Sequence, residues 1–180
     1  MKKSSAVLLL ALLIGFSATR KTQSKPAAGQ TSLTTEELRL YGDFLDSFLG
    51  TSGESTPISF SDRTVPLVLN PPDKDRCLQG IGFKISGATQ SPHLFPSSIA
   101  NGRPINLVDQ NKHNAKDLQS GLLSVSEIGF DDAHQFAVFT FTFVWSGFKG
   151  ASYRRFGTLV FRKTNGTWAR ANKTCLDSMT

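Results

Sequence analysis

The sequence predicts an α+β domain in which one N-terminal amphipathic helix packs on a C-terminal antiparallel β-meander. Three observations indicate this class. Residues 34–50 repeat apolar side chains at spacings of three and four, as a helix with one buried face does. Residues 136–145, FAVFTFTFVW, alternate between two faces, as a strand does. Asn165-Gly166 separates two extended segments and is typical of a tight hairpin turn.

The helix is defined by its first turn and by its apolar stripe. Thr34 and Glu37 have the spacing of a capping box, in which each side chain bonds to the backbone of the other residue. The expected helix ends near Gly50. Its buried stripe should contain Leu38, Tyr41, Phe44, Leu45, Phe48 and Leu49.

The middle of the chain is less regular. Pro57 to Ser61 predicts a short strand, and Val65 to Leu69 is expected to extend it at a sheet edge, where Pro66 is tolerated. Gly80 to Ile85 is a candidate strand. Leu107 to Leu118 is a candidate irregular helix.

The C-terminal third predicts successive antiparallel strands. Leu122 to Phe130 should form a strand with a break near Glu127, because the apolar positions change parity there. A turn at residues 131–134 leads into the alternating strand 136–145. Its expected core face carries Phe139, Phe141, Phe143 and Trp145. Tyr153 to Lys163, with Leu159 and Phe161 toward the core, and Trp168 to Ala171 complete the predicted sheet.

The N-terminus resembles a secretory leader. Lys2 and Lys3 precede an apolar run of 11 residues, Ala6 to Phe16, and small residues follow it. A spanning helix needs about 20 apolar residues, so we expect residues 1–18 to be a cleaved signal peptide. Residues 19–30 are polar and predict a flexible tether. Residues 31–180 then form one domain, which we expect to be secreted or periplasmic and to have no transmembrane segment.

Two cysteines, Cys77 and Cys175, are present. An even count in an exported chain predicts a disulfide. Such a bridge would close a long loop, for which chain entropy suggests about 4 to 5 kcal/mol of stabilisation. The alternatives are two free thiols or a nucleophilic Cys77.

The charge is distributed unevenly along the chain. The net charge of the whole chain is +6, but residues 31–180 hold 15 basic and 14 acidic residues. Such a balance makes nucleic acid an unlikely partner. Residues 148–180 nevertheless carry +6. This basic end predicts either charge compensation of the acidic helix or a surface for an anionic protein, glycan or lipid. The candidate binding residues are Lys149, Arg154, Arg155, Arg162, Lys163 and Arg170.

The sequence contains no motif that indicates catalysis or a cofactor. There is no Gly-x-Ser-x-Gly elbow, and His93, His113 and His134 lack the spacing of metal ligands. We therefore expect no metal and no cofactor. Asp62-Arg63-Thr64 follows a predicted strand and suggests an internal salt bridge, although Arg63 or Arg103 could instead line an anion pocket.

Several segments resemble the corresponding parts of small uncharacterised secreted bacterial proteins. These segments are Gly129-Phe130-Asp131, Ser146-Gly147-Phe148-Lys149-Gly150, Asn165-Gly166-Thr167-Trp168 and, near the helix, Ser61-Asp62-Arg63-Thr64. The resemblance implies no established activity. Many members carry cysteines in the Gly-rich loop, where this chain has Trp145 and Lys149, so no role for those thiols transfers. A helix followed by a curved sheet is also similar to cystatin-like or nuclear-transport-factor-like domains.

The favoured function is a non-enzymatic secreted or periplasmic binding or accessory protein. The alternative is a small hydrolase or ligand-binding domain with a pocket between helix and sheet. The sequence does not decide whether the protein is an enzyme, but the missing motifs favour the first hypothesis.

Overall fold

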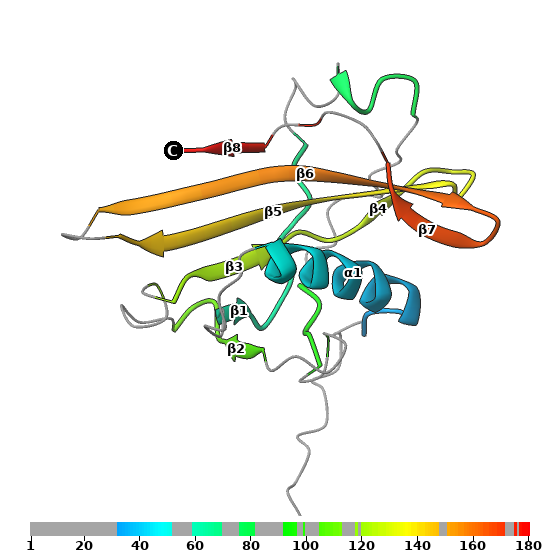
Figure 1. Cartoon of the computed structure of the whole chain (residues 1–180). Coiled ribbons are helices and arrows are strands. Elements are labelled where there is room, and N and C mark those ends of the chain that lie inside the picture. The colour runs from blue at the N-terminus through cyan, green and yellow to red at the C-terminus, as the bar shows by residue number, and fades with distance from the viewer. Residues whose placement is uncertain are drawn as a thin grey trace, which may run out of the picture.

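One helix and an eight-stranded mixed sheet form the part of the protein that the computed structural model describes (Figure 1). The described residues are 32–51, 59–69, 76–81, 92–96, 99, 105–112, 118, 120–147, 151–171, 175 and 177–180. The predicted α+β class is confirmed. The predicted signal peptide (1–18) and tether (19–30) lie outside the described residues.

Helix α1 spans Thr35–Thr51, as its sequence pattern predicts. The capping box is formed: Glu37 N donates to Thr34 Oγ1 (3.2 Å) and Thr34 N donates to Glu37 Oε2 (2.7 Å). Tyr41, Phe44 and Leu45 of the predicted stripe are buried, and Leu40 joins them.

The sheet follows the order β2-β1-β3-β5-β6-β7, with β4 beside β5 and β8 beside β6. Its β1 segment pairs in parallel with both neighbours, whereas the pairs from β3 onward are antiparallel. The meander therefore occupies the C-terminal part of a mixed sheet. The strands are β1 Ser59–Ser61, β2 Asn106–Val108, β3 Leu122–Val125, β4 Gly129–Phe130, β5 Phe136–Ser146, β6 Ser152–Thr164, β7 Thr167–Arg170 and β8 Asp177–Met179.

The predicted break near Glu127 is present between β3 and β4, and it takes the form of a β-bulge. Val125 pairs with Phe141 and Gly129 with Val138, so the first strand contains one residue more than its partner. Tyr41 Oη donates to Ser126 O (2.7 Å), and this burial raises the Tyr41 pKa. The bulge thus fixes the helix to the sheet.

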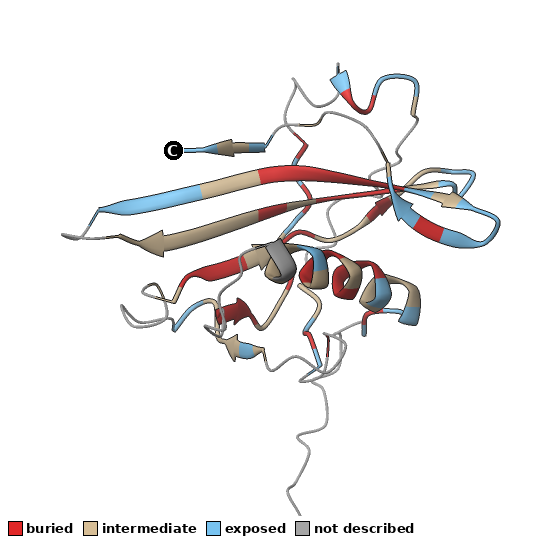
Figure 2. Ribbon diagram, viewed as in Figure 1, coloured by how far each residue is buried: buried red, intermediate tan, exposed pale blue. Residues whose placement is uncertain are grey.

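The helix covers one face of the sheet, which we call the helix face. Phe139 and Phe141 point from β5 toward Tyr41 and Phe44, with ring centroids between 5.1 and 5.6 Å apart. Leu159 and Phe161 of β6 are buried in the same cluster, as predicted. This aromatic interior is the main core, and Figure 2 shows it as the buried middle of β5, β6 and α1.

The other face, which we call the outer face, has a smaller and different cover. Segment 63–69 crosses it, beginning with a single bridge from Val65 to the bulge residue Ser126. Leu67 and Leu69 then pack with Val138, Val160 and the disulfide. The predicted edge strand Val65–Leu69 was therefore wrong: after one bridge, the segment leaves the sheet plane because Leu67 and Leu69 are buried on top of the sheet.

The predicted disulfide is confirmed. Cys77 is bonded to Cys175 across a sequence separation of 98, with Cα atoms 5.1 Å apart. It attaches the outer-face cover to the chain just before β8. Strand β8 pairs with the edge of β6 and was not predicted, because its sequence has no alternating pattern.

Two further expectations for the middle of the chain were wrong where the structure describes them. Leu107 and Val108, predicted to start an irregular helix, belong to strand β2 because they pair with β1. Gly80 and Ile81, expected in a strand, lie in and just after a turn, where Gly80 has φ +76°. Residues 82–85 and 113–117 lie outside the described part.

Candidate functional site

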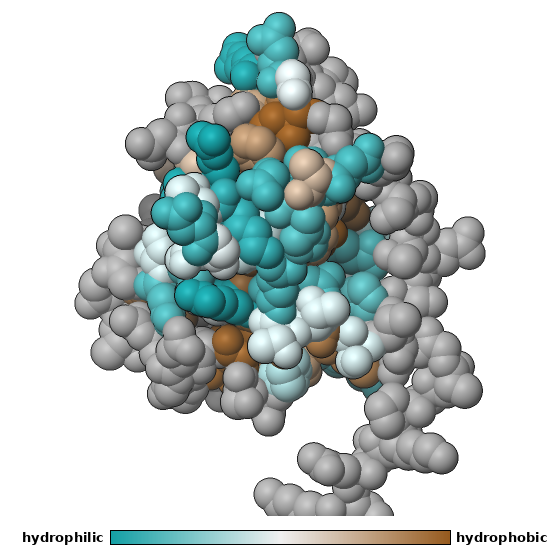
Figure 3. All heavy atoms as spheres, turned by 90° about the vertical axis from the view of Figure 1, so that its right-hand side faces the viewer, coloured by the Kyte–Doolittle hydropathy of each residue, from teal (hydrophilic) through white to brown (hydrophobic). Residues whose placement is uncertain are grey.

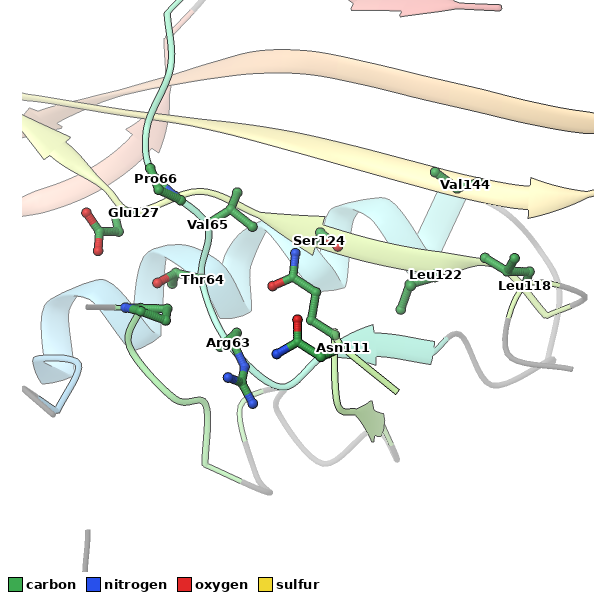
Figure 4. Close-up of a pocket in the computed structure, with 12 residues that line it drawn as sticks. Arg63, Thr64, Val65, Pro66, Asn111, Leu118, Leu122, Ser124, Glu127 and Val144 are labelled. Carbon is green, nitrogen blue, oxygen red and sulfur yellow. The ribbon is translucent and has the colours of Figure 1, made fainter. Parts of the chain in front are cut away.

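Two adjoining cavities lie on the outer face of the sheet, on either side of Val65 and Pro66. The first has a volume of about 630 Å³ and rests on β3, and the second has a volume of about 340 Å³ and rests on β5 and β6. Both contain Val65 and Pro66 in their walls. We call the pair the outer groove. Figure 4 shows segment 63–66 crossing in front of the sheet, with the helix behind it.

The first cavity combines apolar walls with amide and hydroxyl groups. Leu122, Ser124 and Val144 form its floor, because the register places Leu122 opposite Val144. Gln110 and Asn111 line it from the turn after β2. Arg63 stands at one end and Glu127 at another, and Figure 4 shows their charged groups pointing away from each other. Among the described residues of this cavity, Arg63 and Glu127 therefore do not form a converging acid and base pair.

Arg63 makes the internal salt bridge that the sequence suggests. Its Nε and Nη2 donate to both carboxylate oxygens of Asp62, at 2.8 and 3.0 Å, and Asp109 lies 3.6 Å from Nη2. The Asp62 hydrogen bonds raise the pKa of Arg63. A backbone N–H from Asn111, together with Lys112 and Arg63, lowers the pKa of Asp109. Arg63 is thus already neutralised, although it also lines the cavity.

The second cavity contains a different arginine. Arg154 is exposed, and its guanidinium lies 5.5 Å from the Phe156 ring centroid. Arg154 is the only charged residue among the described residues that line this cavity. Thr140, Thr142 and Thr158 supply hydroxyls, and Val65, Val68 and Phe156 supply apolar walls.

The predicted basic residues do not share one face. Arg154 and Arg162 lie on the outer face, and the β5–β6 and β6–β7 registers place Arg155, Lys163 and Arg170 on the helix face. At about 3.4 Å per residue, Arg154 and Arg162 are about 27 Å apart along β6. Lys149 lies outside the described residues.

Lys163 compensates an acidic group of the helix, one of the two roles predicted for the basic end. Glu36 Oε1 accepts from Lys163 Nζ (2.8 Å) and Trp168 Nε1 (2.7 Å), and His134 Nε2 lies 2.7 Å from Oε2. These contacts, with Lys163 first, lower the Glu36 pKa to about 2. This end of the molecule, which faces the viewer in Figure 3, is largely hydrophilic at its surface.

Arg155 is neutralised as well. Its Nε and Nη2 donate to both oxygens of Asp177 in β8, at 2.9 and 2.8 Å. The pair raises the pKa of Arg155 and lowers that of Asp177. Arg170 remains on the helix face, beside a cavity of about 190 Å³ that Asp43 and Ser47 also line.

Other chemistries find little support in the described residues. No group of three His, Cys, Asp or Glu side chains there is placed to hold a metal ion. No helix in that part is long and apolar enough to cross a membrane. Between helix and sheet, where the alternative hypothesis places a pocket, the aromatic core fills most of the described interior. The cavity of about 190 Å³ beside Arg170 nevertheless lies there, between Asp43 and Ser47 of α1 and strands β6 and β7.

Sequence reasoning did not find the outer groove. Its lining comes from segments 63–68, 110–111, 122–124, 140–144 and 154–158, which only the fold brings together. The one local signal was Thr140, Thr142 and Val144 on the face opposite the phenylalanines, which we assigned to a strand without assigning a cover.

Comparisons of the chain with protein-family models, with curated proteins and with solved structures found no match. The resemblance to small secreted bacterial proteins stays a prediction.

Proposed function

We propose that this protein is a non-enzymatic binding or accessory protein that acts outside the cytoplasm and holds its ligand in the outer groove. The observation that carries the proposal is the groove itself. The first cavity has mainly apolar walls with hydroxyl and amide groups between them, and the second has polar and apolar walls in similar proportion. Apolar walls combined with a few polar groups are typical of small-molecule sites. The ionisable groups at its first cavity do not converge on one point (Figure 4).

The disulfide supports the extracytoplasmic part of the proposal, because such bonds persist in oxidising compartments. The layout of the first 18 residues supports it independently. In the native host, we expect the isolated protein to lack this leader and to take up alkylating reagent at Cys77 and Cys175 only after reduction. Intact mass measured with and without reductant tests this. A protein that retains Met1 and reacts at both thiols without reductant would remove the extracytoplasmic assignment.

Binding in the groove can be tested with an uncharged fluorescent probe, Nile red. We expect saturable fluorescence enhancement with the folded mature protein and loss of at least tenfold affinity in Thr142→Trp, which fills the groove floor. Thr164→Trp is the matched control, because it makes the same substitution on the outer face of β6 but outside the groove lining. If Thr142→Trp does not fold, Ser124→Trp repeats the test from β3. Equal binding by both tryptophan variants and the native protein would overturn the proposal.

A further inference from the structure

We infer that the second cavity binds a small amphipathic monoanion, whose anionic group pairs with Arg154 and whose hydrocarbon part lies on the neighbouring apolar wall. This inference rests on the proposed function, because it assigns the ligand class of the same groove. It is argued from the charge, the wall and the geometry around Arg154.

Arg154 is positioned for an anion that the described residues do not supply. Its backbone is fixed on both sides, since Arg154 N donates to Thr180 O (2.9 Å) and Thr180 N donates to Arg154 O (2.8 Å). Its neighbour Arg155 pairs with Asp177, but Arg154 forms no ion pair with another described residue. A guanidinium stays charged at every relevant pH and presents paired donors that match a carboxylate. The guanidinium lies 5.5 Å from the Phe156 ring centroid, so it stands beside the apolar part of the cavity.

The lining beside Arg154 includes apolar side chains that are accessible to a ligand. Val68 is 68% exposed, although it is a large aliphatic residue, and Pro66 next to it is exposed as well. Phe156, half-buried on β6, faces the same cavity. An apolar wall next to one fixed positive charge matches a ligand with a hydrocarbon part and one negative charge.

The size of the site favours a small ligand over a polyanion. The cavity of about 340 Å³ lies at the small end of the roughly 300–1,000 Å³ typical of ligand pockets. It adjoins the larger cavity at Val65 and Pro66, so a longer chain can continue beyond it. A polyanionic glycan or a lipid surface would need several unpaired cations on one face. Among the described residues, the other outer-face arginine of β6, Arg162, is about 27 Å away along the strand, and Arg63 of the adjoining cavity is already paired with Asp62.

The experiment uses three defined amphiphiles below their aggregation concentrations: octanoate, decanoate and decyltrimethylammonium. We expect calorimetric titration of the mature protein to show saturable binding of decanoate. Octanoate should bind more weakly, by about three- to fourfold for each buried methylene that it lacks. The cationic amphiphile should bind at least tenfold more weakly than decanoate.

Two arginine variants decide the role of Arg154. Arg154→Ser should weaken decanoate binding at least tenfold, and Arg154→Lys should restore part of it. Arg162→Ser is the matched control, because Arg162 lies on the same strand and face and also stands over an aromatic ring, Phe136, at 5.8 Å. Its affinity for decanoate should stay within twofold of the native value.

The outcomes separate the two proposals. If Nile red binding is lost in Thr142→Trp but decanoate binding is unchanged in Arg154→Ser, the monoanion assignment is wrong and the groove proposal stands. Equal losses in Arg154→Ser and Arg162→Ser, or equal binding of the cationic amphiphile, also overturn the assignment. Tight binding to phosphatidylglycerol vesicles without binding of free decanoate would point to a membrane surface and overturn it as well. If no probe binds in a manner sensitive to Thr142→Trp, both proposals fail.

Discussion

The two faces of the sheet are built from the same alternating strands but are covered in different ways. On the helix face, a regular amphipathic helix matches the sheet, and 16 of the described buried residues form one aromatic cluster. On the outer face, an irregular segment and a disulfide cover only one end, where six described buried residues cluster. The rest of this face carries the outer groove.

The difference shows that the alternating pattern of a strand does not specify what covers each face of the sheet. Alternation makes both faces of β5 suitable for a sheet, since β-branched residues occupy one face and aromatic residues the other. Of the elements that the structure describes, only α1, on the helix face, offers a continuous apolar stripe. The outer face therefore keeps accessible hydroxyl and aliphatic groups that can contact a ligand.

The largest expected effect is in the helix-face core. Phe139 is completely buried and contacts Tyr41, Phe44 and Phe161. Phe139→Ala should lower the free energy of unfolding by about 3 to 5 kcal/mol, because it leaves a cavity among rings that cannot collapse fully. Val144→Ala, on the outer face of the same strand, should cost less than about 1 kcal/mol. Urea unfolding followed by fluorescence measures both, and similar losses would erase the distinction between the two faces.

The disulfide should give the next largest effect, and it belongs to the outer face. Replacing both Cys77 and Cys175 by serine should cost about 2 to 5 kcal/mol, because the bridge closes a loop with a sequence separation of 98. The thermal midpoint of the double variant, compared with that of the native protein with and without reductant, measures this. If reduction leaves the midpoint unchanged, the cover of the outer face does not depend on the covalent bond.

The contacts of Glu36 on the helix face predict that the free energy of unfolding depends on pH. The Glu36 pKa falls from its ordinary 4.5 to about 2 in the folded protein, so its contribution is complete above pH 4.5 and is lost as the pH falls toward 2. Because its side chain is 32% exposed, solvent screening reduces this contribution to about 1 to 2 kcal/mol. Glu36→Gln should remove this contribution to the dependence of the unfolding free energy on pH. Unfolding free energies of both proteins between pH 2 and 6 test it, and parallel curves would contradict the assignment.

The smallest stability effect should come from the arginines of the outer face. Arg154→Ser and Arg162→Ser should each change the free energy of unfolding by no more than about 0.5 kcal/mol, because neither arginine forms an ion pair within the described part of the chain. Arg155→Ser, which breaks the pair with Asp177, should cost more than either. Thermal midpoints of the three variants rank them. An equal loss in Arg154→Ser would show that Arg154 serves the fold rather than a ligand.

Much of the fold could be predicted because its signals are local. The capping box placed the start of α1, and the parity change near Glu127 predicted the break between β3 and β4, which the structure shows to be a bulge. Asn165 and Gly166 have the positive φ angles, 51° and 78°, that the turn required. The cysteine count predicted the pairing of Cys77 with Cys175. The middle segments failed because prolines and glycines interrupt their periodicity, so burial in the whole fold decided their conformation.

The sequence by itself determined the helix, the long strands, their turns and the disulfide, since each of these depends on residues close in the chain or on the only possible cysteine pair. Tertiary structure decided which charges are neutralised and where a ligand can bind. Lys163 meets Glu36 across 127 positions, and Arg154 meets the wall of segment 65–68 only because that segment crosses the sheet. Such contacts depend on strand register and chain crossing, which no local spacing of residues specifies.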